Sequence, residues 1–436
     1  MTNWIVCKLD EICDIFTGNS INEKEKLEKY TNISTGYNYI GTKDIGFDQC
    51  IDYDNGIKIP ANDLKFKIAP KGSVLLCIEG GSAGRKIGLT NQDVCFGNKL
   101  CAFVSKIDNR YIFYFLQTSD FRNIFSYNKN GLIGGVSVNK LKEIEIPLPP
   151  LAEQGRIVAK IEELFAGIDA GVENLKSVKN QIALYRQSVL KSAFDGTLYK
   201  TTEWNFTSIG TVCDINPKTV LPDFSDDSIV SFLPMPTVEA ETGAFSLETV
   251  EYKKVKKGYT KFQNNDVLFA KITPCMENGK SCVVHDLIQG VGFGSTEFHV
   301  LRCHAGMLPE YVFYFVVQKV FRSKAIPFMT GAVGQKRVPA DYLRDYEIPV
   351  PTLAEQERIV AEIESRFERA DALETTVDRA LNDAEKLKQA VLKKAFSGEL
   401  VPQNPDDEPA SVLLDRIRAE RAAEQRANPK KGKRKR

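Results

Sequence analysis

The chain carries one stretch twice, and this stretch decides the fold. LAEQ at 151–154 and RIVA at 156–159 return as LAEQ at 353–356 and RIVA at 358–361. The offset is 202 residues in both cases, and no gap is needed to align the copies. Two copies of one unit in a single chain predict an internal repeat with approximate two-fold symmetry.

Length and composition describe a globular chain with more than one core. With 436 residues, of which 43% are hydrophobic and 26% charged, two or more domains are expected. There is no signal segment after MTNW at the start, and no apolar run approaches the about 20 residues that span a bilayer. The ten cysteines are scattered without a C-x-x-C pair, so we expect reduced, buried thiols and a cytoplasmic location.

Charge alone does not decide whether the chain binds nucleic acid. The net charge is +1, and DNA binding needs a local basic surface rather than a basic average. The one basic run, KKGKRKR at 430–436, is typical of a disordered, solvated segment.

Residues 151–195 and 353–397 are predicted to form two long helices. Apolar residues recur in both at steps of three and four for more than four heptads, which is typical of coiled coils. A lone helix with one apolar stripe is not stable, so we expect the two copies to pair, and the pseudo-two-fold symmetry makes the pair antiparallel. The predicted coiled-coil core is Ile157, Ile161, Leu164, Ile168, Val172, Leu175, Ile182, Val189, Ile359, Ile363, Phe367, Leu373, Val377, Leu387 and Val391.

The remaining sequence predicts two globular parts that match more faintly. YIFYF at 111–115 returns as YVFYF at 311–315, and the segments 111–125 and 311–325 are expected to be short helices. Alternating apolar runs at 73–78 and 266–270 indicate strands. The fold class is therefore α+β. Mixed α/β globular domains are expected at 1–150 and 199–352, helical spacers at 151–198 and 353–400, and a charged tail at 401–436.

Four strings imitate catalytic or metal motifs but lack residues that the chemistry needs. GGSAGRK at 80–86 is followed by Ile87 instead of Ser or Thr, so a P-loop is not expected. GVGFG at 290–294 has no helix pattern or acidic ribose ligand after it. Asp223 with EYK at 251–253 imitates a nuclease pattern without an equivalent in the first half. The neighbouring residues His285, His299, Cys303 and His304 lack zinc-type spacing. We therefore expect a chain without an active site.

IPLPPLAEQ at 146–154 and IPVPTLAEQ at 348–356 resemble the start of the helical spacers in type I restriction–modification specificity subunits. AFDGTL at 193–198, AFSGEL at 395–400 and NPDDEPA at 404–410 are similar to the same family. So is KRV at 336–338, ahead of the second spacer. The first half departs from this pattern, because GVS at 135–137 stands where the second half has QKR.

The resemblance implies a division of labour. Each globular part would be a target recognition domain that reads one half of a bipartite, asymmetric double-stranded DNA site. The helices would space the half-sites and dock two methyltransferase (modification) subunits, and restriction/translocase subunits would join them. S-adenosylmethionine, ATP and Mg²⁺ are expected on these partners and no cofactor or metal on this chain. The alternative is a coiled-coil assembly scaffold that does not bind DNA. The difference between the two globular parts argues against it, because a scaffold has less need of two unlike ends.

Candidate DNA contacts lie in loops rich in glycine, asparagine and basic residues, whose donors reach phosphates and base edges. In the first half they are Arg85, Lys86, Asn98, Lys99, Lys129 and Asn130. In the second half they are Lys271, Thr273, Asn278, Lys280, Gln335, Lys336 and Arg337.

Overall fold

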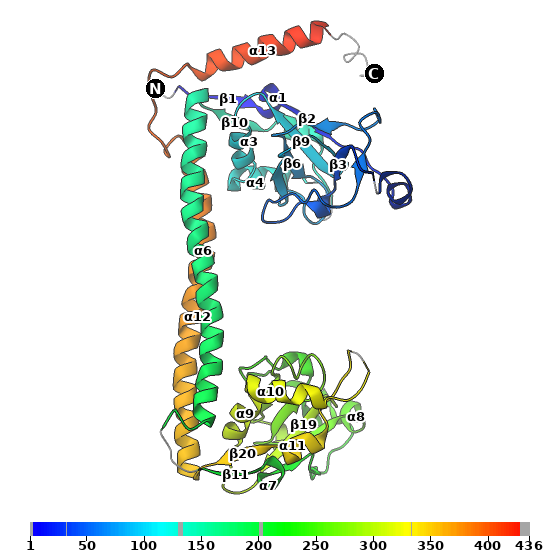
Figure 1. Ribbon diagram of the computed structural model, residues 1–436, viewed down its shortest axis with the longest axis vertical. Helices are drawn as coiled ribbons and strands as arrows, with labels where there is room; N and C mark the ends of the chain where they lie inside the picture. Colours follow the sequence, from blue (N-terminus) through cyan, green and yellow to red (C-terminus); the bar gives the residue numbers. More distant parts are fainter. Residues whose placement is uncertain (1–2, 32, 130–133, 200–203, 333, 428–436) are drawn as a thin grey trace. The chain divides into compact units, whose positions relative to one another are not determined.

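The computed structural model describes residues 3–31, 33–129, 134–199, 204–332 and 334–427 (Figure 1). The chain forms two compact units, Met1–Asn174 with Ala380–Arg436, and Leu175–Arg379. Each unit holds one globular domain and a part of both long helices. No described helix is both long and apolar enough to cross a membrane.

Three sheets build the first domain. β1 (Ile5–Lys8) pairs with β10 (Glu145–Leu148), an antiparallel sheet has the order β2-β9-β6-β7, and a mixed sheet has the order β4-β3-β8-β5. The strand bounds are β2 Cys13–Thr17, β3 Tyr37–Ile40, β4 Lys58–Ile59, β5 Ile68–Ala69, β6 Val74–Cys77, β7 Ile87–Leu89, β8 Val94–Phe96 and β9 Leu100–Ser105. The helices are α1 Leu9–Ile12, α2 Glu23–Glu25, η1 Lys26–Tyr30, η2 Thr42–Asp44, α3 Asn109–Phe115, α4 Ser119–Tyr127 and α5 Val138–Lys142.

The second domain repeats this topology strand for strand. β11 (Asn205–Ser208) pairs with β20 (Glu347–Val350), and the larger sheets have the orders β12-β19-β16-β17 and β14-β13-β18-β15. The strand bounds are β12 Cys213–Ile215, β13 Ile229–Leu233, β14 Glu248–Glu251, β15 Thr260–Gln263, β16 Val267–Ala270, β17 Ser281–Val283, β18 Val291–Gly294 and β19 Phe298–Cys303. The helices are α7 Ile209–Val212, η3 Met235–Thr237, α8 Tyr252–Val255, η4 Ile288–Gly290, α9 Pro309–Val317, α10 Lys319–Ala325, η5 Ile326–Phe328 and α11 Ala340–Asp345. The predicted α+β class and internal repeat are confirmed.

The segment expected as one helix at 111–125 folds as two, because Thr118 begins a new helix. Its hydroxyl accepts a hydrogen bond from the amide of Phe121, which satisfies a free donor in the first turn of α4. Four aromatic side chains of these two helices are buried in the core of the first domain, namely Tyr111, Phe115, Phe121 and Phe125. The ten cysteines are free, and seven of them are buried, in keeping with their expected role as small apolar residues.

The repeated LAEQ motif has a structural cause. The side chain of Gln154 is fully buried, accepts from the amide of Asp108 (3.3 Å) and donates to the carbonyl of Pro149 (2.9 Å). Gln356 is buried in the same way, accepting from Leu308 N (2.8 Å) and donating to Pro351 O (3.0 Å). Each glutamine therefore ties the start of a long helix to the loop that enters an aromatic helix, and both copies keep it because a buried amide needs its partners.

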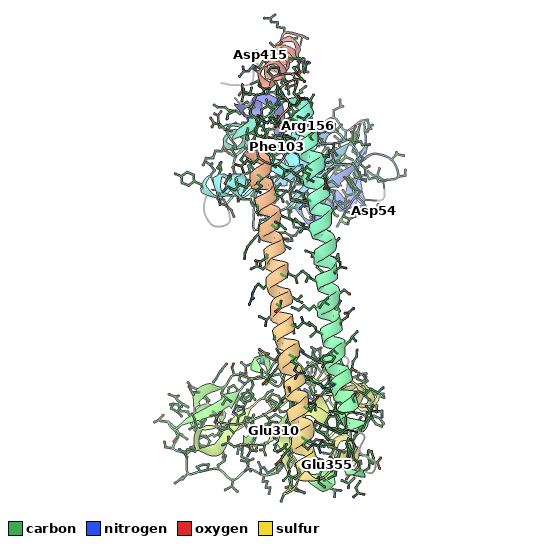
Figure 2. The ribbon with its side chains drawn as sticks, turned by 90° about the vertical axis from the view of Figure 1, so that its left-hand side faces the viewer. Asp54, Phe103, Arg156, Glu310, Glu355 and Asp415 are labelled. Carbon is green, nitrogen blue, oxygen red and sulfur yellow. The ribbon has the colours of Figure 1, made fainter. Side chains whose placement is uncertain are left out.

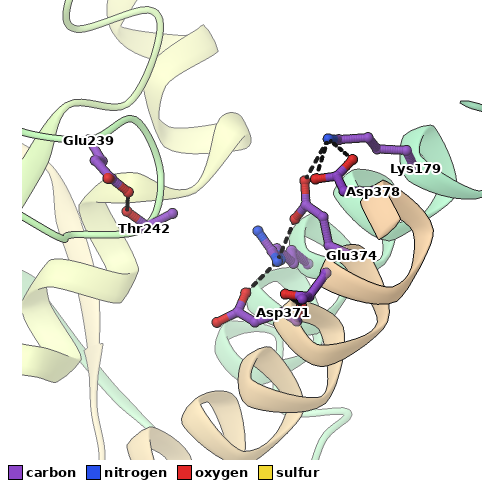
Figure 3. A network of polar contacts seen from close by, with 8 residues as sticks. Lys179, Glu239, Thr242, Asp371, Glu374 and Asp378 are labelled. Carbon is purple, nitrogen blue, oxygen red and sulfur yellow. Dashed lines mark hydrogen bonds and ion pairs between the residues drawn. The ribbon is translucent and has the colours of Figure 1, made fainter. Parts of the chain in front are cut away.

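The two long helices, α6 (Leu151–Phe194) and α12 (Leu353–Phe396), pair antiparallel as predicted (Figure 2). In the second unit, Lys179 Nζ lies 2.8 Å from Asp378, and farther along α6 Arg186 pairs with Asp371 and Glu374 (Figure 3). In the first unit, Lys388 Nζ lies 2.5 Å from Asp169. Ion pairs of opposite charge thus hold the register along the helix pair.

The predicted coiled-coil core divides into three groups. Ile157, Ile161, Leu164 and Val391 belong to the core of the first domain, and Val189, Ile359, Ile363 and Phe367 to that of the second. Ile182 and Val377 are buried between the helices, whereas Ile168, Val172 and Leu175 are half-buried.

Leu373 and Leu387 depart from this prediction, because their side chains are 48% and 53% exposed. Their neighbours in sequence, Glu374 and Lys388, face α6 instead and make the ion pairs just described. At these two points, the residue that faces α6 is therefore the one after the expected leucine, and it forms an ion pair instead of an apolar contact.

Within the expected charged tail at 401–436, residues 410–427 fold as helix α13 (Ala410–Ala427), an element that the sequence analysis did not predict. Ala410, Leu413, Leu414 and Ile417 are buried in the core of the first domain together with α1. Ion pairs flank this contact, with Arg418 2.6 Å from Glu11 and Arg421 3.0 Å from Asp14. The basic run at 430–436 lies outside the described residues.

Removing the apolar contact of α13 is expected to destabilise the first domain. Leu413→Ala leaves a cavity in a packed core and should lower the free energy of unfolding by about 2–5 kcal/mol. Urea denaturation followed by circular dichroism measures the change. Val412→Ala, on the exposed side of the same helix, is the matched control. Equal stability of the two variants would show that α13 does not contribute to this core.

Candidate nucleic-acid interface

In both domains, three chain segments meet beside a β-hairpin, and we call this place the hairpin junction. In the first domain, Ile78 donates to Lys99 O (2.9 Å) and accepts from Val136 N (3.0 Å) through its backbone. In the second domain, Lys271 donates to Glu297 O (2.9 Å) and accepts from Val338 N (2.9 Å). The backbone of the two junctions is therefore equivalent, although their side chains differ.

Most of the candidates in the second half gather at its hairpin junction. The amide of Thr273 donates to the carbonyl of Lys336 (3.0 Å), which joins the two candidate loops. The side chains of Gln335, Lys336 and Asn278 are exposed, and Lys336 forms no ion pair with any described residue. Lys336 is thus a cation at the junction that is free to meet a phosphate.

Arg337, in contrast, is occupied inside the domain. Its guanidinium donates twice to Glu297, with Nη2–Oε1 at 2.8 Å and Nε–Oε2 at 2.9 Å. This pair lowers the pKa of the Glu297 carboxyl, an effect that burial partly opposes. This bidentate pair fixes the guanidinium against the hairpin, and a DNA contact by Arg337 stays a prediction.

Lys86 and Lys280 occupy equivalent positions in the two domains, and each donates a hydrogen bond to a backbone carbonyl of its own domain. The backbone bonds Cys77 N–Lys86 O (2.9 Å) and Ala270 N–Lys280 O (3.0 Å) place them at the same position. Lys86 Nζ donates to the carbonyl of Thr42 (3.0 Å) in η2, and Lys280 Nζ to that of Met235 (3.1 Å) in η3. Both ammonium groups therefore fix a 3₁₀ turn against the hairpin, which the sequence did not suggest.

Around the first junction, the exposed groups are differently arranged. Arg85 is exposed, donates to Gly81 O (2.7 Å) and lies over the ring of exposed Phe47 (5.3 Å), as does Lys86 (5.2 Å). Lys99 stands where the second domain has Glu297 and lies 3.7 Å from Glu79. Asn98 is exposed and Lys129 half-buried, whereas Asn130 lies outside the described residues.

A basic cavity of about 530 Å³ adjoins the second junction through Lys271. Its polar lining includes Asn216, Lys218, Tyr259 and Lys261, and none of its lining residues is acidic. Burial lowers the pKa of Lys271, although Glu297 partly opposes this. Sequence reasoning missed Lys218, Tyr259 and Lys261. The signal was the pair of short basic strings NPK at 216–218 and YTK at 259–261.

His299 connects this cavity to the junction. Its Nε2 lies 2.8 Å from the carbonyl oxygen of Val338, and its Nδ1 lies 3.0 Å from the side-chain nitrogen Nδ2 of Asn216. Burial lowers the pKa of the imidazole, and nearby Lys271 adds to this, whereas the bond to Val338 and Glu297 oppose it. A neutral ring that donates through Nε2 and accepts at Nδ1 fits both partners.

The strings that imitated catalytic motifs lie in ordinary structural surroundings. Lys253 forms surface ion pairs with Glu251 (3.2 Å) and Asp227 (2.9 Å), and GVGFG at 290–294 overlaps strand β18. His304 lies 3.1 Å from Asp214, and His285 lies 2.7 Å from Asp286. Among the described residues, no group of three His, Cys, Asp or Glu side chains is placed to hold a metal ion.

The two matched domains and their paired helices can be compared with known proteins. A family model described as the type I restriction modification DNA specificity domain matches residues 1–180 and 201–383. The chain belongs to this family. Both matched regions begin at or near the start of a globular domain and extend into a long helix, so the family unit coincides with the structural repeat.

Individual relatives agree with this assignment. The chain is 35% identical over 262 residues to the EcoAI specificity subunit of Escherichia coli, which is 50% of this chain but only 44% of that relative's length. It is 26% identical over 462 residues to the EcoKI specificity subunit of Escherichia coli strain K12, with 96% of each chain covered. A solved chain from work on complex assembly and conformational transition of the type I R-M system shares the fold, with a TM-score of 0.70, 18% identity and 91% and 98% coverage.

The environment of His299 predicts a pH-dependent stability. Because its pKa is lowered in the folded domain, the unfolded chain takes up a proton first as the pH falls below about 6.5. The free energy of unfolding should therefore fall over that range until the lower folded pKa is reached, and His299→Gln should lose this dependence. Urea denaturation at about pH 7.5 and about pH 5.5 measures it. His285→Gln, at an exposed histidine, is the control, and an equal loss in wild type and His299→Gln would contradict the prediction.

Proposed function

We propose that the chain is the DNA-recognition subunit of a type I restriction–modification complex, each domain reading one half of a bipartite, asymmetric site. One observation carries the proposal, the equivalent backbone of the two hairpin junctions under unlike side chains. An equivalent frame presents each loop to DNA in the same manner, whereas different donors and charges select different bases. Two unlike readers in one chain allow the two half-sites to differ, which identical subunits of a dimer do not.

In the second domain, we assign phosphate contacts to Lys336, Lys218 and Lys261, and to Lys271 at the wall of the basic cavity. Asn278, Gln335 and Thr273 are the neutral donors beside them. In the first domain, we assign the corresponding DNA contacts to Arg85, which lies over the ring of Phe47, and to Asn98, Lys99 and Lys129. Lys86, Lys280 and Arg337 support the loops through the internal bonds described above.

The two long helices are proposed to space the half-sites and to dock two methyltransferase subunits, to which restriction/translocase subunits bind. Leu184, on α6, is 68% exposed, and Leu373 and Leu387 are exposed on α12. We assign these exposed leucines to the surface that the partner covers. S-adenosylmethionine, ATP and Mg²⁺ are assigned to those partners, the present chain is non-catalytic, and the complex is placed in the cytoplasm. A scaffold that does not bind DNA is not favoured, because the family model is that of a DNA specificity domain.

Reversing the charge of the lysines that form no ion pair with any described residue tests DNA recognition. Lys336→Glu and Lys218→Glu, in the complex with the methyltransferase subunit, should weaken binding to random-sequence duplex DNA. Each lost phosphate contact should reduce the slope of log affinity against log salt by about 1. Fluorescence anisotropy over a salt series measures both quantities. The control is Lys386→Glu, an exposed lysine on α12. If both variants keep the wild-type slope, these lysines do not contact DNA.

Changing the exposed leucines tests the partner surface. Leu184→Ser and Leu387→Ser should each remove about 1.5–3 kcal/mol of apolar burial from the complex, without unfolding the free chain. Co-purification of a tagged methyltransferase subunit measures the loss. Leu64→Ser, at a leucine that is 93% exposed in the first domain, is the matched control. Full retention of the partner by both helix variants would reject this surface.

A further inference from the structure

The second domain carries an apolar groove that the DNA-recognition proposal does not use. The groove has a volume of about 980 Å³ and lies between α10, η5, α11 and the last turns of α6. Its floor includes Val320, Phe328, Tyr342 and Tyr346, of which Phe328 is 59% exposed. The aromatic rings lie in a row and are tilted against one another, with ring centroids 5.1 Å apart for Phe328–Tyr342 and 5.4 Å apart for Tyr342–Tyr346. Such a row of exposed apolar groups is costly in water unless a partner covers it.

The rim of the groove is basic. Lys191, Lys319 and Lys324 line it, whereas none of its lining residues is acidic. None of these three ammonium groups forms an ion pair within the described part of the chain. Their positive charge is therefore available to carboxylates of a partner, and the apolar floor between them offers nothing to a phosphate backbone.

One polar group of the floor lacks a partner. The hydroxyl of Tyr342 is buried and has no hydrogen-bond partner among the described residues. A buried donor without an acceptor costs about 1–3 kcal/mol. Because this oxygen is enclosed by its own domain, the groove presents only the ring of Tyr342 to a bound segment.

The first domain shows that the fold alone does not produce this groove. The equivalent site between α4 and α5 has a volume of about 530 Å³ and is lined by Ile124, Asn128, Lys140, Glu143 and Glu145, among others. Lys140 Nζ donates to the carbonyl of Asn128 (3.2 Å). The lining of this site thus includes two carboxylates and lacks the row of aromatic rings found in the second domain.

We propose that the groove of the second domain docks a short acidic amphipathic segment of a protein partner, one segment per chain. The apolar residues of the segment cover Val320, Phe328 and Tyr342, and its carboxylates pair with Lys191, Lys319 and Lys324. An amphipathic helix in an apolar groove is a common mode of peptide recognition. Because the equivalent site among the described residues of the first domain has a different lining, the partner binds to one domain only, unlike a partner that docks on the repeated helices.

The full chain is titrated with a short fluorescein-labelled peptide in which Leu and Phe recur at helical spacing and the other positions are Glu or Ala. The result expected is saturable binding of one peptide per chain. The double variant Lys319→Glu/Lys324→Glu and the single variant Phe328→Ser should each weaken it about tenfold or more. Ile124→Ser, at an exposed position of the equivalent site in the first domain, should bind the peptide as wild type does. Circular dichroism checks that all variants fold, which their exposed positions favour.

Two further peptides test the chemistry of the segment, one with Lys in place of Glu and one with the same composition in shuffled order. Both should bind at least about tenfold more weakly than the acidic peptide. Undetectable binding of the acidic peptide, or equal binding to wild type and both groove variants, would overturn the proposal. So would equal affinity for the lysine peptide. If the lysine variant instead weakens duplex DNA binding and leaves the peptide affinity unchanged, the groove is a DNA surface.

Discussion

The packing of one phenylalanine at the end of each long helix is the interaction on which the rest of the structure depends. Phe396 is the last residue of α12. Its ring centroid lies 4.8 Å from that of Tyr111 and 5.5 Å from that of Phe115 in the first domain. Phe194 is the last residue of α6. Its ring centroid lies 4.9 Å from that of Tyr311 and 5.3 Å from that of Phe315 in the second domain. Each domain is therefore completed by the helix that does not directly follow it. α6 starts in one core with Ile157 and Ile161 and ends in the other core with Phe194. Each long helix therefore supplies apolar surface to both domain cores, and a lone helix with one apolar stripe is not stable.

The sequence predicted those parts of the fold whose cause is local or repeated. The helical period of 151–195 and 353–397 and the paired YxFYF strings gave the helices and the internal repeat, because both are visible as spacing. Helix α13 escaped notice because its four buried residues, Ala410, Leu413, Leu414 and Ile417, lie among charged ones, and those charges pair with α1 and β2 only after folding. Leu373 and Leu387 were misplaced for a related reason. At those points Glu374 and Lys388 face α6 instead, and their ion-pair partners, Arg186 and Asp169, stand in a distant part of the chain.

The candidate site was harder to predict, because the availability of a cation depends on its partners. Lys86, Lys280 and Arg337 were chosen for their charge and their glycine-rich surroundings, yet each donates to oxygen atoms of its own domain. Lys336, one residue before Arg337, has the same charge and makes no ion pair within the described chain. Lys86, Lys280 and Arg337 are half-buried, and their internal acceptors hold the charged groups in place. Composition counts all of these cations alike, whereas their availability to a phosphate depends on the internal partners that only the structure reveals.

The two halves obey different constraints, and this explains where they differ. Gln154 and Gln356, Lys86 and Lys280, and Phe396 and Phe194 stand at equivalent places because each satisfies a buried contact that the common fold creates. Lys99 and Glu297 also stand at equivalent places, yet they carry opposite charges, since the backbone bonds of the junction do not involve their side chains. The same freedom lets α13 pack on the first domain, with no counterpart among the described residues of the second, and lets an apolar groove form only in the second. Symmetry is therefore retained where a buried group has one possible partner, and it is lost where the side chain faces water or another molecule. On that reasoning, the differences between the two domains mark the surfaces through which the chain distinguishes one ligand from another.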